Sequence, residues 1–326
     1  MRHANRLFTI LAAALAVAAI SPPTQAQPFP SRPIKLVVPY PPGGSTDILA
    51  RLLAERLTIV LGQPMVVENR VGATGVVGAE AVARSRTDGY TMLMGAGGPL
   101  TQVPALRKNM PYDTLKDFAP IILAAKSPKL VVVTNAFPAD SPQALVRFLK
   151  SKSREVRYGS AGVGSSGHFA NELFKLSAGV DMTHVPYKGG AQAITDMMAG
   201  HVEVVMEVMP QLLPLVRSGK IRAIGLTQLT RSPLLPEVPT LAESGFPGFE
   251  AYVWFGIVAP TGTPTPIISR LNAEFAKVLG TPEFKKRLED LGADHEPNTP
   301  EDFGRFIRAE WDKWQRVVQS AGIKDE

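Results

Sequence analysis

The stretch LVVPYPPGGSTD at residues 36–47 joins a β-rich run, a glycine-rich turn and a hydroxyl-rich helix start. The stretch YGSAGVGSSGH at residues 158–168 repeats this design in the middle of the chain. In such turns, backbone N–H groups can point at a ligand without obstruction by side chains. The start of the following helix adds unpaired N–H donors and a partial positive charge. Both stretches therefore favour binding of an anion such as a carboxylate.

Outward from these two stretches, short β-rich runs alternate with amphipathic helices, which is typical of α/β proteins with largely parallel sheets. Leu49, Leu53 and Leu57, for example, recur at helical spacing, and Gly62 ends their run. We predict strands at residues 34–38, 64–68, 90–94, 118–123, 130–134, 156–160, 183–185, 202–206, 221–226 and 252–258. We predict helices at residues 47–61, 78–84, 141–150, 168–177 and 191–199, followed by three more before the C-terminus.

The composition argues against several kinds of site and partner. The 326 residues include no cysteine, which excludes disulfides, thiolate metal sites and a cysteine nucleophile. The net charge of +6 is spread along the chain without a long basic run, so we do not expect nucleic-acid binding. The histidines form no spaced metal-binding motif, and we expect no metal site.

Residues 1–26 have the features of a secretory signal peptide. Arg2 and Arg6 precede an apolar run at residues 7–20, and small residues allow cleavage after Ala26. The apolar run is too short to span a bilayer of about 30 Å. We therefore expect export to the periplasm, and export argues against NAD, ATP and other cytosolic cofactors.

The chain after residue 26 is longer than a single hydrophobic core usually accommodates, so we expect two lobes. Crossings between lobes are predicted at residues 124–129 and near residues 222–228, which makes the middle lobe an insertion in the outer one. The predicted division is a signal peptide at 1–26, an outer lobe at 27–124 plus 226–326, and a middle lobe at 125–225. Two crossings of this kind would form a hinge.

Other interpretations of the second stretch stay open. Each stretch can also be an ordinary strand-to-helix turn with a capped helix. The residues Gly162-x-Gly164-x-x-Gly167 match the fingerprint of dinucleotide-binding proteins. In that fingerprint, an acid stands at the C-terminal end of the next strand, whereas Asp181 comes before that strand, so the context does not fit. A secreted hydrolase using Ser165 or Ser166 with His168 is the alternative function. No Gly-x-Ser-x-Gly motif supports it, and no acid is visibly placed to orient the histidine.

Three further residues are candidates for the site. Tyr187 could stack on a ligand or hydrogen-bond to it, and Lys188 could attract anions. Glu207, after the predicted strand at residues 202–206, could receive a ligand amine, cap a helix or hold the hinge. Asp47 lies in a first helical turn, where it is expected to steady the loop rather than touch an anion.

Several short motifs, in their order and spacing along the chain, resemble those of the tripartite tricarboxylate transporter receptor family, the Bug-type periplasmic solute-binding proteins. The resemblance extends over residues 34–292. It rests on PYPPGGSTD at 39–47, VENR at 67–70, DGYT at 88–91, YGSAG at 158–162 with His168, VPYKGG at 185–190, PEVPT at 236–240 and WFG at 254–256.

The resemblance implies an α/β Venus-flytrap fold of the periplasmic binding protein type (type II-like), with two lobes joined by two crossover strands. It also implies a small organic acid held mainly by backbone groups of the two loops and by ordered water. Similar proteins take citrate, dicarboxylates, acidic amino acids or aromatic acids. The chain departs from the family pattern at Glu207, where similar proteins tend to have Asp. It also departs at residues 95–101, whose Gly-Ala-Gly-Gly-Pro run lacks the expected polar residues.

The expected function is therefore that of a monomeric, non-enzymatic receptor that uses no cofactor. It would capture a carboxylate by hinge closure, for a membrane transporter or for a sensor. The predicted ligand-binding residues are Tyr40, Pro42, Gly43, Gly44, Ser45, Thr46, Asp47, Ser160, Ala161, Gly162, Gly164, Ser165, Ser166, His168, Tyr187 and Glu207.

Overall fold

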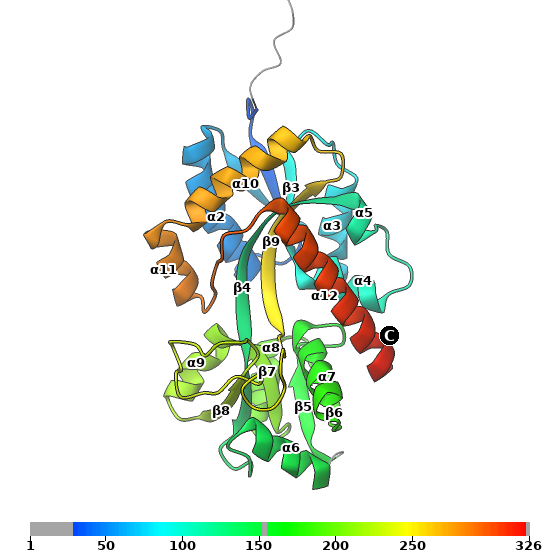
Figure 1. Ribbon diagram of the computed structural model, residues 1–326, viewed down its shortest axis with the longest axis vertical. Helices are drawn as coiled ribbons and strands as arrows, with labels where there is room; N and C mark the ends of the chain where they lie inside the picture. The colour runs from blue at the N-terminus through cyan, green and yellow to red at the C-terminus, as the bar shows by residue number, and fades with distance from the viewer. Residues whose placement is uncertain (1–28, 152–154, 324–326) are drawn as a thin grey trace, which may run out of the picture.

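The computed structural model describes residues 29–151 and 155–323, and the predicted signal peptide lies outside them. The chain forms two lobes joined by the long strands β4 (Phe118–Thr134) and β9 (Tyr252–Pro260) (Figure 1). Each lobe has a mixed sheet with buried clusters on both faces, so the predicted two-lobed α/β fold is confirmed. Among the described residues, no helix combines the length and the apolar character needed to cross a membrane.

We call the lobe at the top of Figure 1 the upper lobe and the other the lower lobe. The sheet of the upper lobe is built around β1, whose residues alternate between two cores. Ile34, Leu36 and Val38 face one core and Val37 faces the other, so β1 is apolar almost throughout, as expected for a strand covered on both faces. The strands in order are β2 (Met65–Asn69), β1 (Ile34–Val38), β3 (Thr91–Ala96), β9 and the first part of β4. The helical segments are α2 (Ser45–Leu61), η1 (Ala73–Gly75), α3 (Val76–Ala83), η2 (Gly98–Gln102), α4 (Val103–Leu106), α5 (Thr114–Asp117), α10 (Thr265–Leu279) and α11 (Pro282–Asp290).

The lower lobe repeats this arrangement around β7, which pairs parallel with β5 and antiparallel with the second part of β4. Val204 and Met206 face one core, and Val205 faces the other. The strands are β6 (Thr183–Pro186), β5 (Arg157–Ser160), β7 (Val204–Val208), β4 and β8 (Ile221–Leu226). The helices are α6 (Pro142–Ser151), α7 (Ser166–Ala178), α8 (Gly190–Met198) and α9 (Met209–Arg217).

Strand β4 corrects the sequence analysis, which predicted two strands, at residues 118–123 and 130–134, separated by a crossing at residues 124–129. The strand is continuous: Pro128 pairs with Tyr252 of β9, and Lys129 pairs with Val208 of β7. Proline has no backbone N–H to donate to a ladder. Here it stands where β4 changes partners, so the missing donor interrupts neither ladder.

The last helix, α12 (Pro300–Ala321), spans both lobes (Figure 1). Its first half contributes Phe303 to a core of the upper lobe, and its second half contributes Trp314 to a core of the lower lobe. Phe249 and Ala251 also lie in that lower core, although they belong to the predicted outer lobe. The predicted lobe boundaries stay a prediction, and this packing favours ending the middle lobe after residue 251 rather than residue 225.

Candidate functional site

The first glycine loop joins β1 to α2. Gly43 has a φ of 83°, a left-handed conformation that favours glycine, and Gly44 is the N-cap of α2 in an extended conformation. Within the described part of the chain, no side chain caps this helix. The first N–H groups of a helix have no partner inside it, so those of α2 can bind an external anion.

Asp47 holds this loop in place. Its Oδ2 accepts hydrogen bonds from Gly43 N–H and Arg51 Nε, both at 2.9 Å, and its Oδ1 accepts one from Asn69 Nδ2 at 2.9 Å. The hydrogen bond from Arg51 is the main reason that the pKa of this buried carboxyl falls to about 2. Because both oxygens are occupied, Asp47 shapes the loop from behind, as expected, and is not free to meet a ligand.

The second glycine loop joins β5 to α7. Gly162 and Gly164 have φ values of 110° and 77°, and Ser165 Oγ caps α7 by accepting a hydrogen bond from His168 N–H at 3.3 Å. Ser160 Oγ accepts a hydrogen bond from Gly162 N–H at 3.2 Å. The loop therefore has one defined conformation, with the residues around Gly164 at the start of α7.

Three stacked rings support the second loop. The centroids of His168 and His184 lie 4.2 Å apart, and those of His184 and Tyr158 lie 4.8 Å apart. His168 Nδ1 accepts a hydrogen bond from Gly164 N–H at 3.2 Å, and His184 Nε2 lies 2.7 Å from Ser160 Oγ. Burial lowers the pKa of each imidazole to about 4, so both rings are neutral near pH 7.

The support continues below the rings through side chains that sequence reasoning missed. Tyr158 Oη donates to Glu172 Oε1 at 2.5 Å, and Lys175 Nζ donates to the same oxygen at 2.9 Å. The spacing of Glu172 and Lys175, one helical turn apart on α7, was the available signal. His184 was also missed, because it lies sixteen residues beyond the loop it supports.

Two further predicted residues join the second loop. Tyr187 is tied to it by a hydrogen bond from its N–H to Ser160 O at 3.0 Å. Glu207 lies inside β7, which ends at residue 208, and not after the strand as predicted. A Cβ on Gly167 in the first turn of α7, or on Gly190 at the start of α8, would lie 3.0 Å from Glu207 Oε1. Glu207 therefore lies directly behind the starts of two helices.

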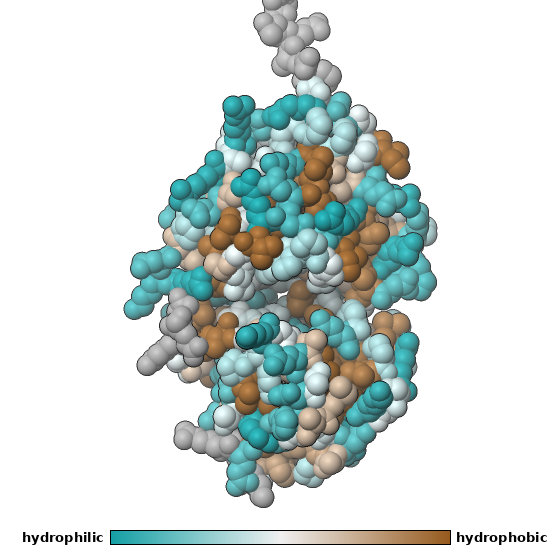
Figure 2. Space-filling model, turned by 180° about the vertical axis from the view of Figure 1, so that it is seen from behind, coloured by the Kyte–Doolittle hydropathy of each residue, from teal (hydrophilic) through white to brown (hydrophobic). Residues whose placement is uncertain are grey.

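The two loops approach a common segment at residues 98–106. A Cβ on Gly98 would lie 2.4 Å from Tyr40 Oη of the first loop, and a Cβ on Gly164 would lie 3.5 Å from Leu106 Cδ2. The approach of Tyr40 leaves no room for a side chain at Gly98. Figure 2 shows a hollow across the middle of the molecule, between the two lobes.

The structure thus brings most of the predicted residues to two loops on different lobes. Those of the first loop are Tyr40, Pro42, Gly43, Gly44, Ser45, Thr46 and Asp47. Those of the second loop are Ser160, Ala161, Gly162, Gly164, Ser165, Ser166 and His168, with Tyr187 and Glu207 beside it.

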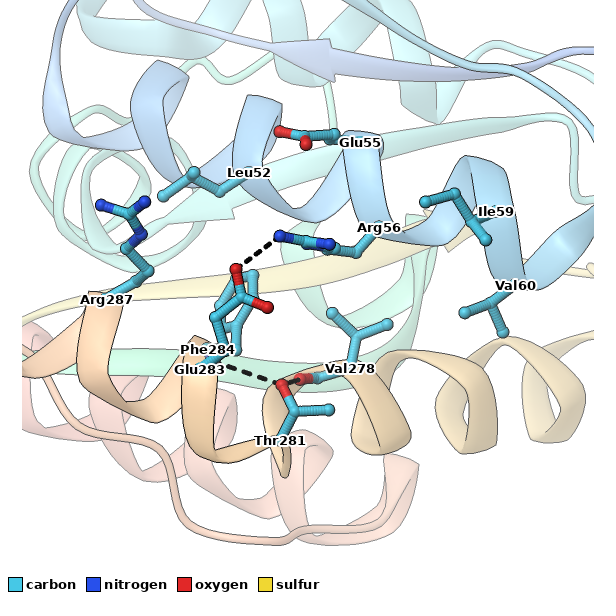
Figure 3. A pocket seen from close by; sticks show the side chains of 10 residues that line it. All are labelled: Leu52, Glu55, Arg56, Ile59, Val60, Val278, Thr281, Glu283, Phe284 and Arg287. Atoms are coloured by element: carbon cyan, nitrogen blue, oxygen red, sulfur yellow. Dashed lines mark hydrogen bonds and ion pairs between the residues drawn. The ribbon is translucent and has the colours of Figure 1, made fainter.

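A different pocket of about 300 Å³ lies on the outside of the upper lobe, between α2 and the helices α10 and α11 (Figure 3). Its wall is partly apolar, with Ile59, Val60 and Phe284, and its Arg56 is paired with Glu283 at 2.5 Å. None of the glycine-loop residues lines it. Among the described residues, no group of histidine, aspartate and glutamate side chains is placed to hold a metal ion.

The hydrogen bonds of His168 do not fit a serine hydrolase. Its Nδ1 accepts from the backbone of Gly164, and Ser165 Oγ accepts from the backbone of His168 rather than donating to an imidazole. The acid below the rings, Glu172, bonds to Tyr158 and Lys175. A general base needs a ring nitrogen facing the nucleophile and an acid that orients the ring.

Comparison with known proteins agrees with this geometry. Residues 49–323 match the profile of the "Tripartite tricarboxylate transporter family receptor". Protein BugT of Bordetella pertussis is 38% identical over 98% of both chains. The solved structure of Rhodopseudomonas palustris Rpa4515 with adipate is 40% identical, with a TM-score of 0.79 over 91% of this chain and 99% of that one. That of MatC from the same species with bound malate is 33% identical, with a TM-score of 0.75 over 89% and 100%.

Proposed function

Because the chain belongs to the tripartite tricarboxylate transporter receptor family, a family of periplasmic solute-binding receptors, we propose that it captures a small dicarboxylate between its two lobes. The observation that carries this proposal is the pair of glycine loops, one on each lobe, each leading into a helix N-terminus and each approaching residues 98–106. A helix N-terminus favours a carboxylate through its free N–H groups and its dipole. Two of them suit a ligand with a carboxylate at each end.

The relatives support this ligand class. The solved structures of Rpa4515 and MatC hold adipate and malate, which are both dicarboxylates. In this chain the ligand would contact the backbone N–H groups of Gly44 and Ser45 on the first loop and of Ser166 on the second, because those of Gly43, Gly164 and Ser165 already donate to Asp47, His168 and Gly162. Tricarboxylates, acidic amino acids and aromatic acids are the other members of the class that the sequence predicts.

Hinge closure is the working step of this proposal, and no chemical reaction is involved. A ligand held by both loops makes contacts in the closed form that the open form lacks, so it shifts the population towards closure. The arrangement around His168 favours this function over a hydrolase. We further propose that the receptor works as a monomer after export to the periplasm, where a membrane transporter or a sensor recognises its closed form.

A thermal-shift screen of the mature, ligand-free protein tests the proposal. A ligand that binds only the folded protein stabilises it by about 2.7 kcal/mol at 100 times its Kd. Adipate, malate, citrate, aspartate and benzoate form a minimal panel, with the uncharged dimethyl ester of adipate as the matched control. We expect at least one dicarboxylate to raise the Tm while the ester does not. A broad acid panel without any shift would contradict the proposal.

A further inference from the structure

Lys129 is a fully buried lysine at the edge of the lower lobe, where β4 changes partners. Its side chain has an exposed fraction of 0%, and its Nζ has no hydrogen-bond partner among the described residues. The nearest opposite charge is Glu207 Oε2 at 3.8 Å, which is an ion pair but too long for a hydrogen bond. Burying an ammonium with so few contacts is unfavourable, so packing alone does not account for a lysine here.

The position of Glu207 indicates a role for the Lys129 ammonium. Its carboxylate is buried behind Gly167 and Gly190, at the starts of α7 and α8. The second glycine loop leads into the same turn of α7, so a bound carboxylate there would lie on the same helix end as Glu207. Two like charges in a poorly solvated place repel each other, and an unpaired Glu207 would oppose the ligand.

We propose that Lys129 is a specificity-determining residue of the binding site, because it neutralises Glu207 and so allows the starts of α7 and α8 to accept an anion. This inference rests on the proposed function. It gives the site a buried cation that acts through Glu207, while the ligand itself is bound by backbone groups.

The position of Lys129 suits this role, because its backbone is fixed independently of the loop. Lys129 N–H donates to Thr227 Oγ1 at 2.8 Å, and Thr227 Oγ1 donates to Ala251 O at 2.7 Å. Three segments of the chain meet at this point. The backbone that carries the cation is therefore anchored outside the ligand loop.

Further ionisable groups lie near the second loop and also affect its charge. His168 and His184 stack under it, and Lys175 pairs with Glu172 and Asp181 on its far side. Burial lowers the pKa of Lys129, and the neighbouring Glu207 opposes that change. A comparison of variants that differ only at residue 207 cancels the contributions of the histidines and of Lys175.

The decisive comparison is Lys129→Met against the double variant Lys129→Met/Glu207→Gln, which share the same change in packing. Calorimetric titration with adipate and with malate should show that Lys129→Met weakens binding at pH 8 by about tenfold or more. The double variant should recover the affinity, because it no longer carries an unpaired Glu207. Lys126→Met is the matched control, because Lys126 lies on the same strand but pairs with the exposed Glu296 at 3.3 Å.

Equal losses in Lys129→Met and the double variant would show that Lys129 only packs, and would overturn the inference. A normal affinity of Lys129→Met would overturn it as well. Urea unfolding provides a test that needs no ligand. Lys129→Met should be less stable than the double variant, because it leaves the buried Glu207 without its opposite charge. Equal stabilities of the two variants would again overturn the inference, whereas wild-type protein that binds no acid contradicts only the proposed function.

Discussion

His168 and His184 couple the second loop to pH. Each has a pKa of about 4 in the folded protein against an ordinary value of 6.5, because burial disfavours the charged ring. A group with a lowered pKa contributes stability above its unfolded pKa and loses it as the pH falls to the folded value. The window is therefore pH 6.5 to 4. Protonation would also turn His168 Nδ1 from an acceptor into a donor facing Gly164 N–H.

The free energy of unfolding should accordingly decrease from pH 6.5 to pH 4, and His168→Asn should flatten this dependence. The buried His168 alone corresponds to about 3 kcal/mol over the window. Chemical unfolding at half-unit pH steps measures the slope. His201→Asn, at an exposed histidine, is the control. An unchanged slope in His168→Asn would show that this ring titrates normally.

Asp47→Asn should destabilise the protein and weaken ligand binding. The change removes a buried carboxylate that accepts from Gly43, Arg51 and Asn69. Hydrogen bonds to charged groups contribute about 1.5 to 3 kcal/mol each, so a loss of about 2 kcal/mol is expected. Urea unfolding and titration with a confirmed ligand measure both effects. Asp290→Asn removes an exposed ion pair to Lys286 and should cost less than about 1 kcal/mol.

Gly44→Val should weaken binding without loss of stability. Gly44 has an ordinary φ of −76°, and its Cβ would meet only Pro41 O at 3.6 Å, so the fold tolerates a side chain. That side chain would cover the donors at the start of α2 and should reduce affinity at least tenfold. Lys188→Ala is the comparison and should cost about 1 kcal/mol of binding energy or less. Normal binding by Gly44→Val, with Lys188→Ala inactive, would contradict the backbone-donor mechanism.

Residue patterns predicted the two loops and the supporting role of Asp47, because glycine, hydroxyl and acid positions carry local information about turns and caps. They did not predict Lys129 or His184. Lys129 follows Pro128 at the start of an apolar run, and that position gives no sign that Glu207 lies opposite on a neighbouring strand. Both contacts join residues that are distant in the sequence.

At the scale of elements, regular runs were predictable and partner changes were not. The bounds of β1 and β8 match the prediction, since both are clear apolar runs between turns. Strand β4 was predicted as two strands separated by residues 124–129, a stretch that contains Pro128, because a proline inside a strand normally indicates a break. Helix α9 was missed for a similar reason, since it contains Pro210 and Pro214.

Helix α12 predicts an unequal effect of its two tryptophans. Trp314 is buried and packs its ring 5.2 Å from Phe169 of α7, whereas Trp311 is partly exposed. Trp314→Ala should lower the free energy of unfolding by about 3 to 5 kcal/mol, and Trp311→Ala should lower it clearly less. Urea unfolding followed by circular dichroism measures the difference. Equal costs would mean that α12 does not anchor to the lower lobe through Trp314.

At the scale of the molecule, the proposed closure should make the receptor more compact. Small-angle scattering with and without a confirmed ligand should show a smaller radius of gyration at constant mass and constant secondary structure. The molecular mass from the same scattering data also tests whether the protein is a monomer. The uncharged ester of the ligand is the control. Superimposable profiles would mean that the lobes do not move.

The unbroken course of β4 has a mechanical consequence. Lobes joined by flexible linkers have no preferred angle. Here β4 and β9 pair along one ladder, with two register shifts, up to Pro128 and Tyr252, and β4 runs on into the other sheet. Turning one lobe against the other must twist this ladder, which resists like a torsion spring. The closed form would then store elastic energy that the ligand holds in place. Release of the ligand would let the spring reopen the molecule, ready for the next capture without any external source of work.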